Sequence, residues 1–361
     1  MPQPRTTIVI VPRESYSVTP LMLETVLTNT PEPRRIVLVL GGSPRRIRQR
    51  LERLASEHDF TFVHCDAVIT PNEARNLAMQ HVSTPYVCFL DNDTLVGERW
   101  LERLEQCADD TGASLVGCPV LWGRDDSWEI HYAGGTCQIT DERGVRRLEE
   151  HNVLMHQPPR VLDTLTRTPT EYVEPHCLLA RVTMLRKIGP FDEQLLIARE
   201  HSDLSLRVSA AGGAIWLEPS AVVMYPWPKR NTIADARLNL VRWSDEWSER
   251  SYRRFNEMWG LTDVSIDDIY RQGHHQRQLR RRPPTGRRVR ARFARALYRA
   301  QRALIAIAAA LAVWSCDRRR ARRRRARVLH AGSWELSPEL TRVAKPDRTA
   351  QTRVSGGANP R

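Results

Sequence analysis

Four short apolar runs alternate with helix-like segments along residues 7–90, and this alternation restricts the folds that the chain can adopt. The runs are rich in Val, Ile and Leu, as buried strands are, and they span residues 7–11, 35–40, 61–64 and 86–90. The segments between them carry apolar residues at helical spacing. Strands and helices that alternate in this way predict parallel βαβ units with right-handed crossovers. We therefore expect an α/β domain whose first half is a parallel sheet.

The fourth apolar run ends in two acidic residues, Asp91 and Asp93, with one residue between them. Side chains two apart on an extended strand point the same way, so the two carboxylates should converge beyond the end of the strand. Open α/β sheets bind ligands at this edge. Mg²⁺ and Mn²⁺ prefer oxygen ligands and can bridge them to a diphosphate. A polar turn that closes a strand has the same pattern, so the pair alone does not decide between the two.

A second acidic cluster lies later in the chain, where Glu200 and Asp203 stand three residues apart. On a helix that begins here they share a face near the first turn. Capping and the helix dipole favour an acid at such a place, which is the ordinary structural explanation. That explanation accounts less well for a second acidic cluster in a sheet protein that already has one.

Four segments of the chain, in one order, resemble motifs of the inverting family 2 glycosyltransferases, which have the GT-A fold. The segments are residues 72–78, 89–93, 189–193 and 200–207. They are similar, in turn, to the family's Ala-Arg-Asn helix, its Asp-X-Asp strand end, its Gly-X-Phe-Asp-Glu turn and its Glu-Asp-X-Asp-Leu-X-X-Arg cluster. The resemblance covers roughly residues 6–226. It implies an α/β fold with a GT-A-type, Rossmann-like mixed sheet flanked by helices.

The resemblance implies transfer of a sugar from a nucleotide-sugar donor to a hydroxyl of a glycan or lipid-linked acceptor, with inversion at the anomeric carbon. Asp91 and Asp93 would hold Mg²⁺ or Mn²⁺, which neutralises charge on the leaving diphosphate, and Asp91 would also contact the donor. The two acidic clusters would face each other across one glycosyl unit. The base would be Asp203, Glu200 or His201. His201 stands where the family usually has an acid, so the choice stays open, with Asp203 narrowly favoured.

Five further positions are candidates for donor binding. Pro12 and Arg13 follow the first strand, where the family approaches the nucleotide. Ser43 follows the second strand, where the family commonly has an Asp that contacts the nucleobase. Arg75 would reach the diphosphate as a cation with several donors, and Asn76 would bind the donor or anchor the loop before the metal site. For both arginines an ordinary surface charge is the alternative.

Two histidines, His131 and His176, are candidates for the acceptor pocket, although a lone histidine is more often structural. Tyr225 stands where the family often has a histidine as a third metal ligand. The seven cysteines are scattered without a Cys-X-X-Cys pair, which favours small buried residues in a reducing compartment over a disulfide framework or a zinc site. The aromatic residues of 243–259 are expected to pack on the apolar face of an amphipathic helix.

The basic charge of the chain belongs to its later part. The formal net charge is +13, and residues 271–330 contain 20 Arg but one acid, Asp317. Within this stretch an apolar run of 12 residues, 303–314, falls short of the ~18–20 residues that span a bilayer. We expect an interfacial helix whose arginines contact anionic headgroups on the cytoplasmic, inner face of the cell membrane. A helix packed within an oligomer and a tail that binds nucleic acid nonspecifically are the alternatives.

The sequence thus predicts a GT-A domain over residues 1–265, an Arg-rich linker and amphipathic helix over residues 266–330, and a disordered tail over residues 331–361. Two other functions stay open. A sugar nucleotidyltransferase also uses paired acids and Mg²⁺, but it normally has a glycine-rich loop after the first strand, and residues 11–16 contain no glycine. An Arg-rich nucleic-acid-binding protein is the alternative outside enzymes, and nucleic acid is the least favoured partner.

Overall fold

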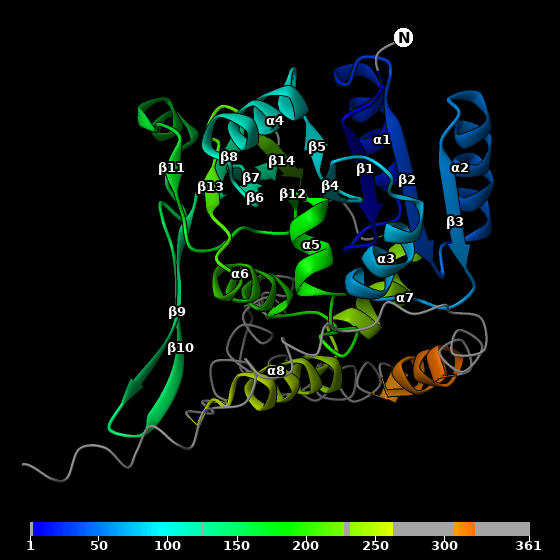
Figure 1. Ribbon diagram of the computed structural model, residues 1–361. Coiled ribbons are helices and arrows are strands. Elements are labelled where there is room, and N and C mark those ends of the chain that lie inside the picture. The colour runs from blue at the N-terminus through cyan, green and yellow to red at the C-terminus, as the bar shows by residue number, and fades with distance from the viewer. Residues whose placement is uncertain (1–2, 125, 227–231, 263–306, 309, 322–361) are drawn as a thin grey trace, which may run out of the picture.

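A mixed sheet of eight strands forms the centre of the protein (Figure 1). The structure, a computed structural model, describes residues 3–124, 126–226, 232–262, 307–308 and 310–321. The strands of the central sheet are β1 (Thr6–Val11), β2 (Arg35–Gly41), β3 (Thr61–Cys65), β4 (Tyr86–Asp91), β6 (Leu115–Gly117), β11 (Thr168–Pro169), β12 (Cys177–Arg181) and β13 (Ile215–Leu217). Their order is β11-β13-β6-β12-β4-β1-β2-β3.

The strands β3, β2, β1 and β4 run parallel, as the alternating sequence pattern predicts. β12 is antiparallel to both of its neighbours, β4 and β6, which makes the sheet mixed. Val11 of β1 pairs with Asp91 of β4, so these two strands end side by side. The loops that follow them therefore meet at the edge that open α/β sheets use for ligands.

Helices cover both faces of the central sheet (Figure 1). They are α1 (Thr19–Asn29), α2 (Arg45–Glu57), α3 (Pro71–Ala78), α4 (Trp100–Thr111), α5 (Val182–Ile188), α6 (Glu200–Ala210), α7 (Ile233–Arg242) and α8 (Asp245–Trp259), with short 3₁₀ turns at Met79–His81 and Pro159–Thr164. Successive strand residues point to opposite faces, which divides the core in two. Ile8 packs in one cluster with Met22 and Leu104, and Val9 packs in the other with Ala74.

A smaller sheet and a long hairpin extend this body. The smaller sheet consists of β5 (Leu95–Val96), β14 (Val223–Pro226), β7 (Val120–Arg124) and β8 (Ser127–Tyr132), in that order. The hairpin pairs β9 (Gly135–Glu142) with β10 (Val145–Asn152) and projects away from the central sheet (Figure 1). Near its base Glu150 accepts a hydrogen bond from Ser202, so β10 lies against the start of α6.

The apolar pattern of the sequence predicts one strand over residues 114–120 and one amphipathic helix over residues 238–259, and each segment divides into two elements in the structure. Residues 114–120 give β6 in the central sheet and the start of β7 in the smaller one. Residues 238–259 fall in two helices, α7 and α8, and Ser244 Oγ caps α8 by accepting a hydrogen bond from the backbone N–H of Trp247. In both places the chain passes from one packing surface to another, and apolar spacing alone does not show such a change.

Two other elements differ from their predicted bounds. The sequence pattern predicts a helix over residues 205–211, but α6 begins five residues earlier, at Glu200, so Glu200 and Asp203 both lie in its first turn. The glycine pair in residues 132–140 suggests a hairpin or a bulge, and this segment contains the junction between β8 and β9. The tight turn lies at Arg143-Gly144, where both residues have positive φ (55° and 79°), a conformation that suits Gly144.

Part of the basic tail is helical and packs on the domain. Residues 310–321 form a helix, drawn in orange in Figure 1, and its Val313 and Cys316 are buried. Arg320 Nε lies 3.1 Å from Glu73 Oε2 in α3. Among the described residues, no helix has both the length and the apolarity to cross a bilayer. Residues 331–361, predicted as a disordered tail, and most of the predicted linker lie outside the described residues.

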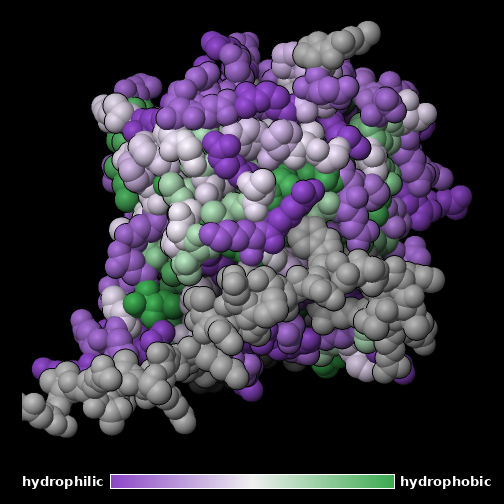
Figure 2. Space-filling model, in the orientation of Figure 1, coloured by the Kyte–Doolittle hydropathy of each residue, from purple (hydrophilic) through white to green (hydrophobic). Residues whose placement is uncertain are grey.

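The cysteines and the aromatic residues of α8 agree with the sequence-based expectations. The face of the molecule in Figure 2 is largely hydrophilic, with small apolar patches between polar side chains. All seven cysteines are free and buried, as predicted. Trp247 and Phe255 of α8 are also buried, which confirms that these aromatic residues belong to the core.

Candidate active site

Asp91 and Asp93 lie buried at the carboxyl edge of the central sheet. Asp93 Oδ2 accepts hydrogen bonds from the backbone N–H groups of Glu14 at 2.9 Å and Ser15 at 3.1 Å. Its Oδ1, and both carboxylate oxygens of Asp91, make no hydrogen bond to the described residues. Burial and the neighbouring charge of Asp91 raise the pKa of Asp93 to about 7. Burial also raises the pKa of Asp91, although Arg13 opposes this.

Arg13 joins the two acidic clusters that lie far apart in the sequence. Its Nη1 donates a hydrogen bond to Glu200 Oε1 at 2.7 Å, and its Nε lies 3.4 Å from Asp91 Oδ2. The Arg13 side chain is 14% exposed, while those of Asp91 and Glu200 are 0% and 3% exposed. The start of α6 therefore faces the end of β4, which is the adjacency that the resemblance implies. The catalytic roles of these acids stay predictions.

The residue between the two acids fixes the loop after β1. Asn92 Nδ2 donates to the backbone oxygen of Ser15 at 3.0 Å and to Thr19 Oγ1 at 2.8 Å, while its Oδ1 accepts from the Arg13 N–H at 2.6 Å. Pro12 is buried directly after β1. The segment that carries the acids thus holds in place the loop that was predicted to approach the donor.

Arg75 is buried beside the acids, so the alternative of a surface charge is wrong for this residue. Its Nη2 lies 3.9 Å from Asp91 Oδ1, and its Nη1 donates to Asn72 Oδ1 at 2.9 Å. The guanidinium carbon is 5.8 Å from the ring centre of Phe89 and 5.7 Å from that of Phe191. Nε and Nη2 make no hydrogen bond to the described residues, which leaves donors for an anion.

Asn76 and Ser43 have other surroundings. Asn76 Nδ2 donates to the backbone oxygen of Phe191 at 2.9 Å, and its Oδ1 accepts from the Phe191 N–H at 3.0 Å, so it anchors the turn at residues 189–193. Ser43 follows β2, and its hydroxyl makes no hydrogen bond to the described residues. Nearby, a Cβ on Gly41 would lie 2.3 Å from the backbone oxygen of Ala67, which explains the glycine. Donor binding by Asn76 and Ser43 stays a prediction.

His201 lies near two carboxylates, Glu150 and Glu174, that no sequence motif marks. Its Nε2 is 3.3 Å from Glu150 Oε2. Burial lowers the pKa of His201, but the charges of Glu174 and Glu150 raise it overall to about 9. The imidazole therefore carries a proton near neutral pH and is not ready to accept another.

The other two candidates for the base differ in how their oxygens are engaged. Asp203 Oδ2 accepts from Arg207 Nε at 3.0 Å, and Oδ1 accepts from Trp259 Nε1 at 3.2 Å. Arg207 also donates to the backbone oxygen of Pro190 at 3.0 Å, so this group supports the turn before α6. Glu200 Oε2, in contrast, is buried and makes no hydrogen bond to the described residues. Burial raises the pKa of Glu200, but Arg13 and His201 lower it to about 2.

Three residues of the site carry no sequence motif, namely Glu150, Glu174 and Arg242. Glu150 comes from the hairpin and pairs with His201. Glu174 Oε2 lies 3.5 Å from His176 Nδ1 just before β12. Arg242 is 3% exposed in α7, and its Nε lies 3.9 Å from a carboxylate oxygen of the loop after β1. One sequence signal existed: Glu174 and His176 are two apart beside an apolar run, as Asp91 and Asp93 are.

The acidic pair fits a divalent cation. Buried carboxylate oxygens without hydrogen-bond donors are the ligands that Mg²⁺ and Mn²⁺ prefer, and the raised pKa of Asp93 shows that the surrounding residues do not offset its charge. Tyr225, at the place of the expected third ligand, donates its hydroxyl to Glu14 Oε2 at 2.7 Å. Asp91 and Asp93 are therefore the residues that would hold the ion.

Comparison with known proteins gives relatives among glycosyltransferases. The sequence model of "Glycosyl transferase family 2" matches residues 7–189, more than half of the 361 residues. The pre-mycofactocin glycosyltransferases of two Mycobacterium tuberculosis strains, CDC 1551 / Oshkosh and ATCC 25618 / H37Rv, are each 26% identical over 174 residues. That alignment covers 46% of this chain and 34% of each relative, so the chain matches about a third of their length.

Solved structures of glycosyltransferases are similar to the chain. GalNAc-T7 with UDP, GalNAc and Mn²⁺ has a TM-score of 0.50 and 16% identity, over 75% of this chain and 54% of that one. The mannosyltransferase PcManGT from Pyrobaculum calidifontis, in complex with GDP-Man and Mn²⁺, has a TM-score of 0.45 and 15% identity, over 86% of this chain and 87% of that one. The predicted GT-A-type fold, a mixed sheet flanked by helices, is confirmed, and the chain belongs to glycosyl transferase family 2.

Proposed function

We propose that this protein transfers a glycosyl residue from a nucleotide-sugar donor to an acceptor hydroxyl, with inversion, and that it does so with a divalent cation. One observation carries the proposal: Arg13 contacts both Asp91 at the end of β4 and Glu200 at the start of α6. A donor seated at the edge of the sheet then has an acid on either side of its reacting carbon. Family membership favours this reaction over that of a nucleotidyltransferase.

The donor end of the site is built for a diphosphate and its cation. Asp91 and Asp93 would hold Mg²⁺ or Mn²⁺, and the bound ion would neutralise negative charge on the leaving diphosphate. Arg75 directs its unpaired N–H donors at the same anion from the buried side. The loop over residues 12–15, fixed by Asn92 and Asp93, forms the wall against the nucleotide.

Glu200 is the proposed base, in place of the narrowly favoured Asp203. Its Oε2 is free of hydrogen bonds to the described residues, whereas both oxygens of Asp203 are engaged. His201 is protonated near neutral pH because Glu174 and Glu150 hold its pKa at about 9 despite burial. Glu200 removes the proton from the acceptor hydroxyl as the hydroxyl attacks, and the donor carbon is released from the diphosphate in the same displacement.

Donor binding is tested by thermal unfolding with UDP, GDP and their sugars, with and without Mn²⁺. A ligand that binds only the native state raises the melting temperature. We expect a Mn²⁺-dependent shift with one nucleoside diphosphate, lost in Asp93→Asn. The absence of a shift with every nucleotide would count against the donor site.

The choice of base is tested by two matched amide substitutions. We expect Glu200→Gln to keep the nucleotide-dependent shift and to lower turnover about 10²–10⁴-fold, the range for loss of a general base. Both variants should melt at a lower temperature without ligand, because Arg13 and Arg207 each lose an ionised partner, but Asp203→Asn should keep the turnover of the folded protein. The reverse pattern, with Asp203→Asn folded normally but inactive, would return the base to Asp203.

The tail helix supports attachment to an anionic membrane, where a lipid-linked or other glycan acceptor is held. Two large apolar side chains on it are exposed, Leu311 (62%) and Trp314 (58%), and so is Ile307 (57%), which precedes residues 310–321. Arg318 lies 4.6 Å over the Trp314 ring, so the exposed face combines apolar and cationic groups. Each arginine near an anionic surface contributes about 1 kcal/mol. The free buried cysteines fit a reducing compartment, which favours the cytoplasmic, inner face of the cell membrane.

Sedimentation with lipid vesicles tests this attachment. Vesicles that contain phosphatidylserine should retain the protein, and neutral phosphatidylcholine vesicles should not. Leu311→Asp with Trp314→Asp should abolish retention, while Arg46→Glu, on the exposed face of α2, should leave it unchanged. If the double substitution changes the oligomeric state and spares vesicle binding, the apolar face belongs to an interface between copies of the chain.

A further inference from the structure

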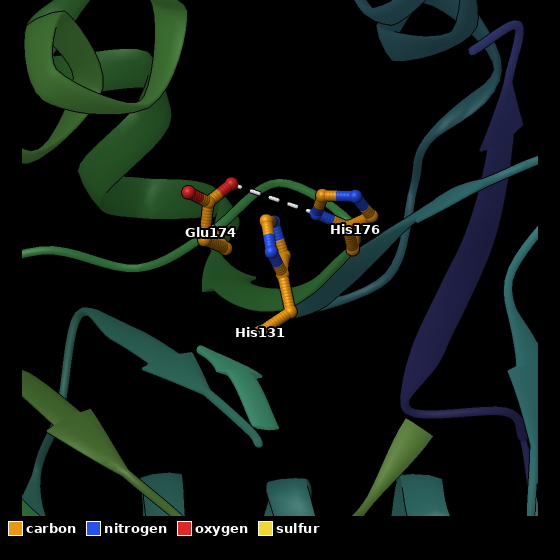
Figure 3. Close-up of side chains that lie close together, drawn as sticks. All are labelled: His131, Glu174 and His176. Atoms are coloured by element: carbon orange, nitrogen blue, oxygen red, sulfur yellow. Dashed lines mark ion pairs between the residues drawn. The ribbon is translucent and has the colours of Figure 1, made fainter. Parts of the chain in front are cut away.

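Three side chains from two different sheets converge beside the acidic pair. His131 comes from β8 of the smaller sheet, whereas Glu174 and His176 come from the segment that enters β12 of the central sheet. One ligand atom from each residue lies within 4.8 Å of the others. Figure 3 shows the three side chains pointing at a common volume, with His131 between the other two.

From this arrangement we propose that His131, Glu174 and His176 form a binding site for a borderline divalent cation such as Zn²⁺, separate from the cation at Asp91 and Asp93. The three residues offer two nitrogens and one oxygen. Two histidines and a glutamate are a ligand set of catalytic zinc sites, which keep a fourth position open for water or substrate. Imidazole ligands favour Zn²⁺ and similar ions, whereas carboxylates alone favour Mg²⁺ and Mn²⁺.

Two ring nitrogens of this cluster make no hydrogen bond to the described residues. They are the Nδ1 atoms of His131 and His176, and both are buried. The contact from His176 Nδ1 to Glu174 Oε2, at 3.5 Å, is an ion-pair contact with no hydrogen bond. Buried polar groups are normally hydrogen-bonded, so two buried ring nitrogens without a hydrogen bond, in a cluster with one carboxylate, favour a bound species.

The packing around the cluster keeps its histidines in place. The ring centres of His131 and His176 lie 5.2 Å apart, with the rings edge to face. The ring centre of Tyr225 lies 5.2 Å from that of His176. The backbone oxygen of His176 accepts the Asp91 N–H at 3.0 Å. The site therefore borders the donor acids, and a cation here joins the two sheets at the wall of the active site.

The test is a titration of the metal-free full chain with Co²⁺, which replaces Zn²⁺ and absorbs visible light, in excess Mg²⁺ to occupy the oxygen site. We expect one Co²⁺ per chain, bound at least about tenfold more weakly by His131→Ala and by Glu174→Gln. Loss of a residue that only hydrogen-bonds a metal ligand already weakens metal binding about 10–100-fold, so loss of a ligand should cost at least as much. His81→Ala, an exposed histidine after α3, and Asp93→Asn should both leave Co²⁺ binding unchanged.

The outcomes separate this site from the donor site. Unchanged Co²⁺ affinity in both His131→Ala and Glu174→Gln, or no binding by the native chain, would overturn the proposal. Equal loss in Asp93→Asn would also overturn it, because the two cation sites would then be one. Circular dichroism of each variant shows whether it is folded, and Glu174→Gln, which preserves the side-chain shape, stands in for His131→Ala if that variant does not fold. No nucleotide is present, so the result does not depend on the proposed reaction.

Discussion

Removal of the charge on Arg13 tests the link between the two acidic clusters. Arg13 lies 2.7 Å from Glu200 and 3.4 Å from Asp91, and these acids are 3% and 0% exposed. Loss of one partner from a buried ion pair costs about 3–5 kcal/mol, because the remaining charge stays buried. The pKa of Glu200 gives a similar figure: burial raises it, but Arg13 and His201 bring it from 4.5 to about 2. A shift of this size corresponds to about 3 kcal/mol of stability at neutral pH.

We therefore expect Arg13→Met to lower the free energy of unfolding by about 3 kcal/mol at neutral pH. Because the folded pKa of Glu200 lies below its unfolded value, this stabilisation is present above pH 4.5 and is lost as the pH falls toward 2. Urea unfolding followed by tryptophan fluorescence measures the change, provided that the slope with denaturant is unchanged.

Arg99 provides a matched control. It makes an ion pair of the same 2.7 Å length with Glu102, but the two side chains are 66% and 61% exposed. Exposed pairs contribute little because water screens them, so Arg99→Met should leave the unfolding curve in place. Glu200→Gln added to Arg13→Met should recover part of the lost stability, since the buried charge is gone. Equal curves for Arg13→Met and Arg99→Met would refute the buried link.

Three further predictions concern the cation site, the loop after β2 and the tail. Burial and a neighbouring acid hold the pKa of Asp93 at about 7, so calorimetric Mn²⁺ affinity should fall about tenfold from about pH 8 to about pH 6, since the ligand must be ionised; a flat profile would contradict this. Gly41→Ala should cost about 1–3 kcal/mol in urea unfolding because its Cβ would overlap a backbone oxygen, whereas Gly97→Ala, with open space, should not. Arg320→Ala breaks a buried ion pair with α3 and should cost about 3 kcal/mol, while exposed Arg319→Ala should not; equal melting of the two would mean that the tail helix does not dock.

The parallel half of the fold could be predicted from the sequence because its strands are buried on both faces. Such strands are apolar without interruption, and the predicted bounds of β1, β2, β3 and β4 agree with the structure to within one residue. The division of residues 114–120 between two sheets could not be predicted, because both pieces are apolar and only the tertiary packing separates them. The docking of Arg320 on Glu73 depends on a contact between residues 247 positions apart, which no local pattern contains.

The site was predictable where a motif coincides with the end of an element. Asp91 and Asp93 close a strand, and Glu200 opens a helix, so position alone marks them. Glu150 and Glu174 lie in a hairpin and in a segment before a strand, and only the fold brings them to His201. The proposed base differs from the favoured one partly for the same reason, because one donor to Asp203 is Trp259, 56 positions away, while the other, Arg207, lies one turn along α6.

The charge balance at the end of β4 supports the proposal that a cation binds at this site. Asp91 is fully buried, and neither of its oxygens receives a hydrogen bond from the described residues. Its closest cation, Arg13, lies nearer to Glu200, and Arg75 is 3.9 Å away. A buried carboxylate in this condition is costly and tends to take up a proton, which agrees with the raised pKa values of Asp91 and Asp93. A divalent cation beside Asp91 and Asp93 removes this cost, and its two positive charges equal the two negative charges of the donor diphosphate. The donor and the cation should therefore bind more tightly together than either binds alone.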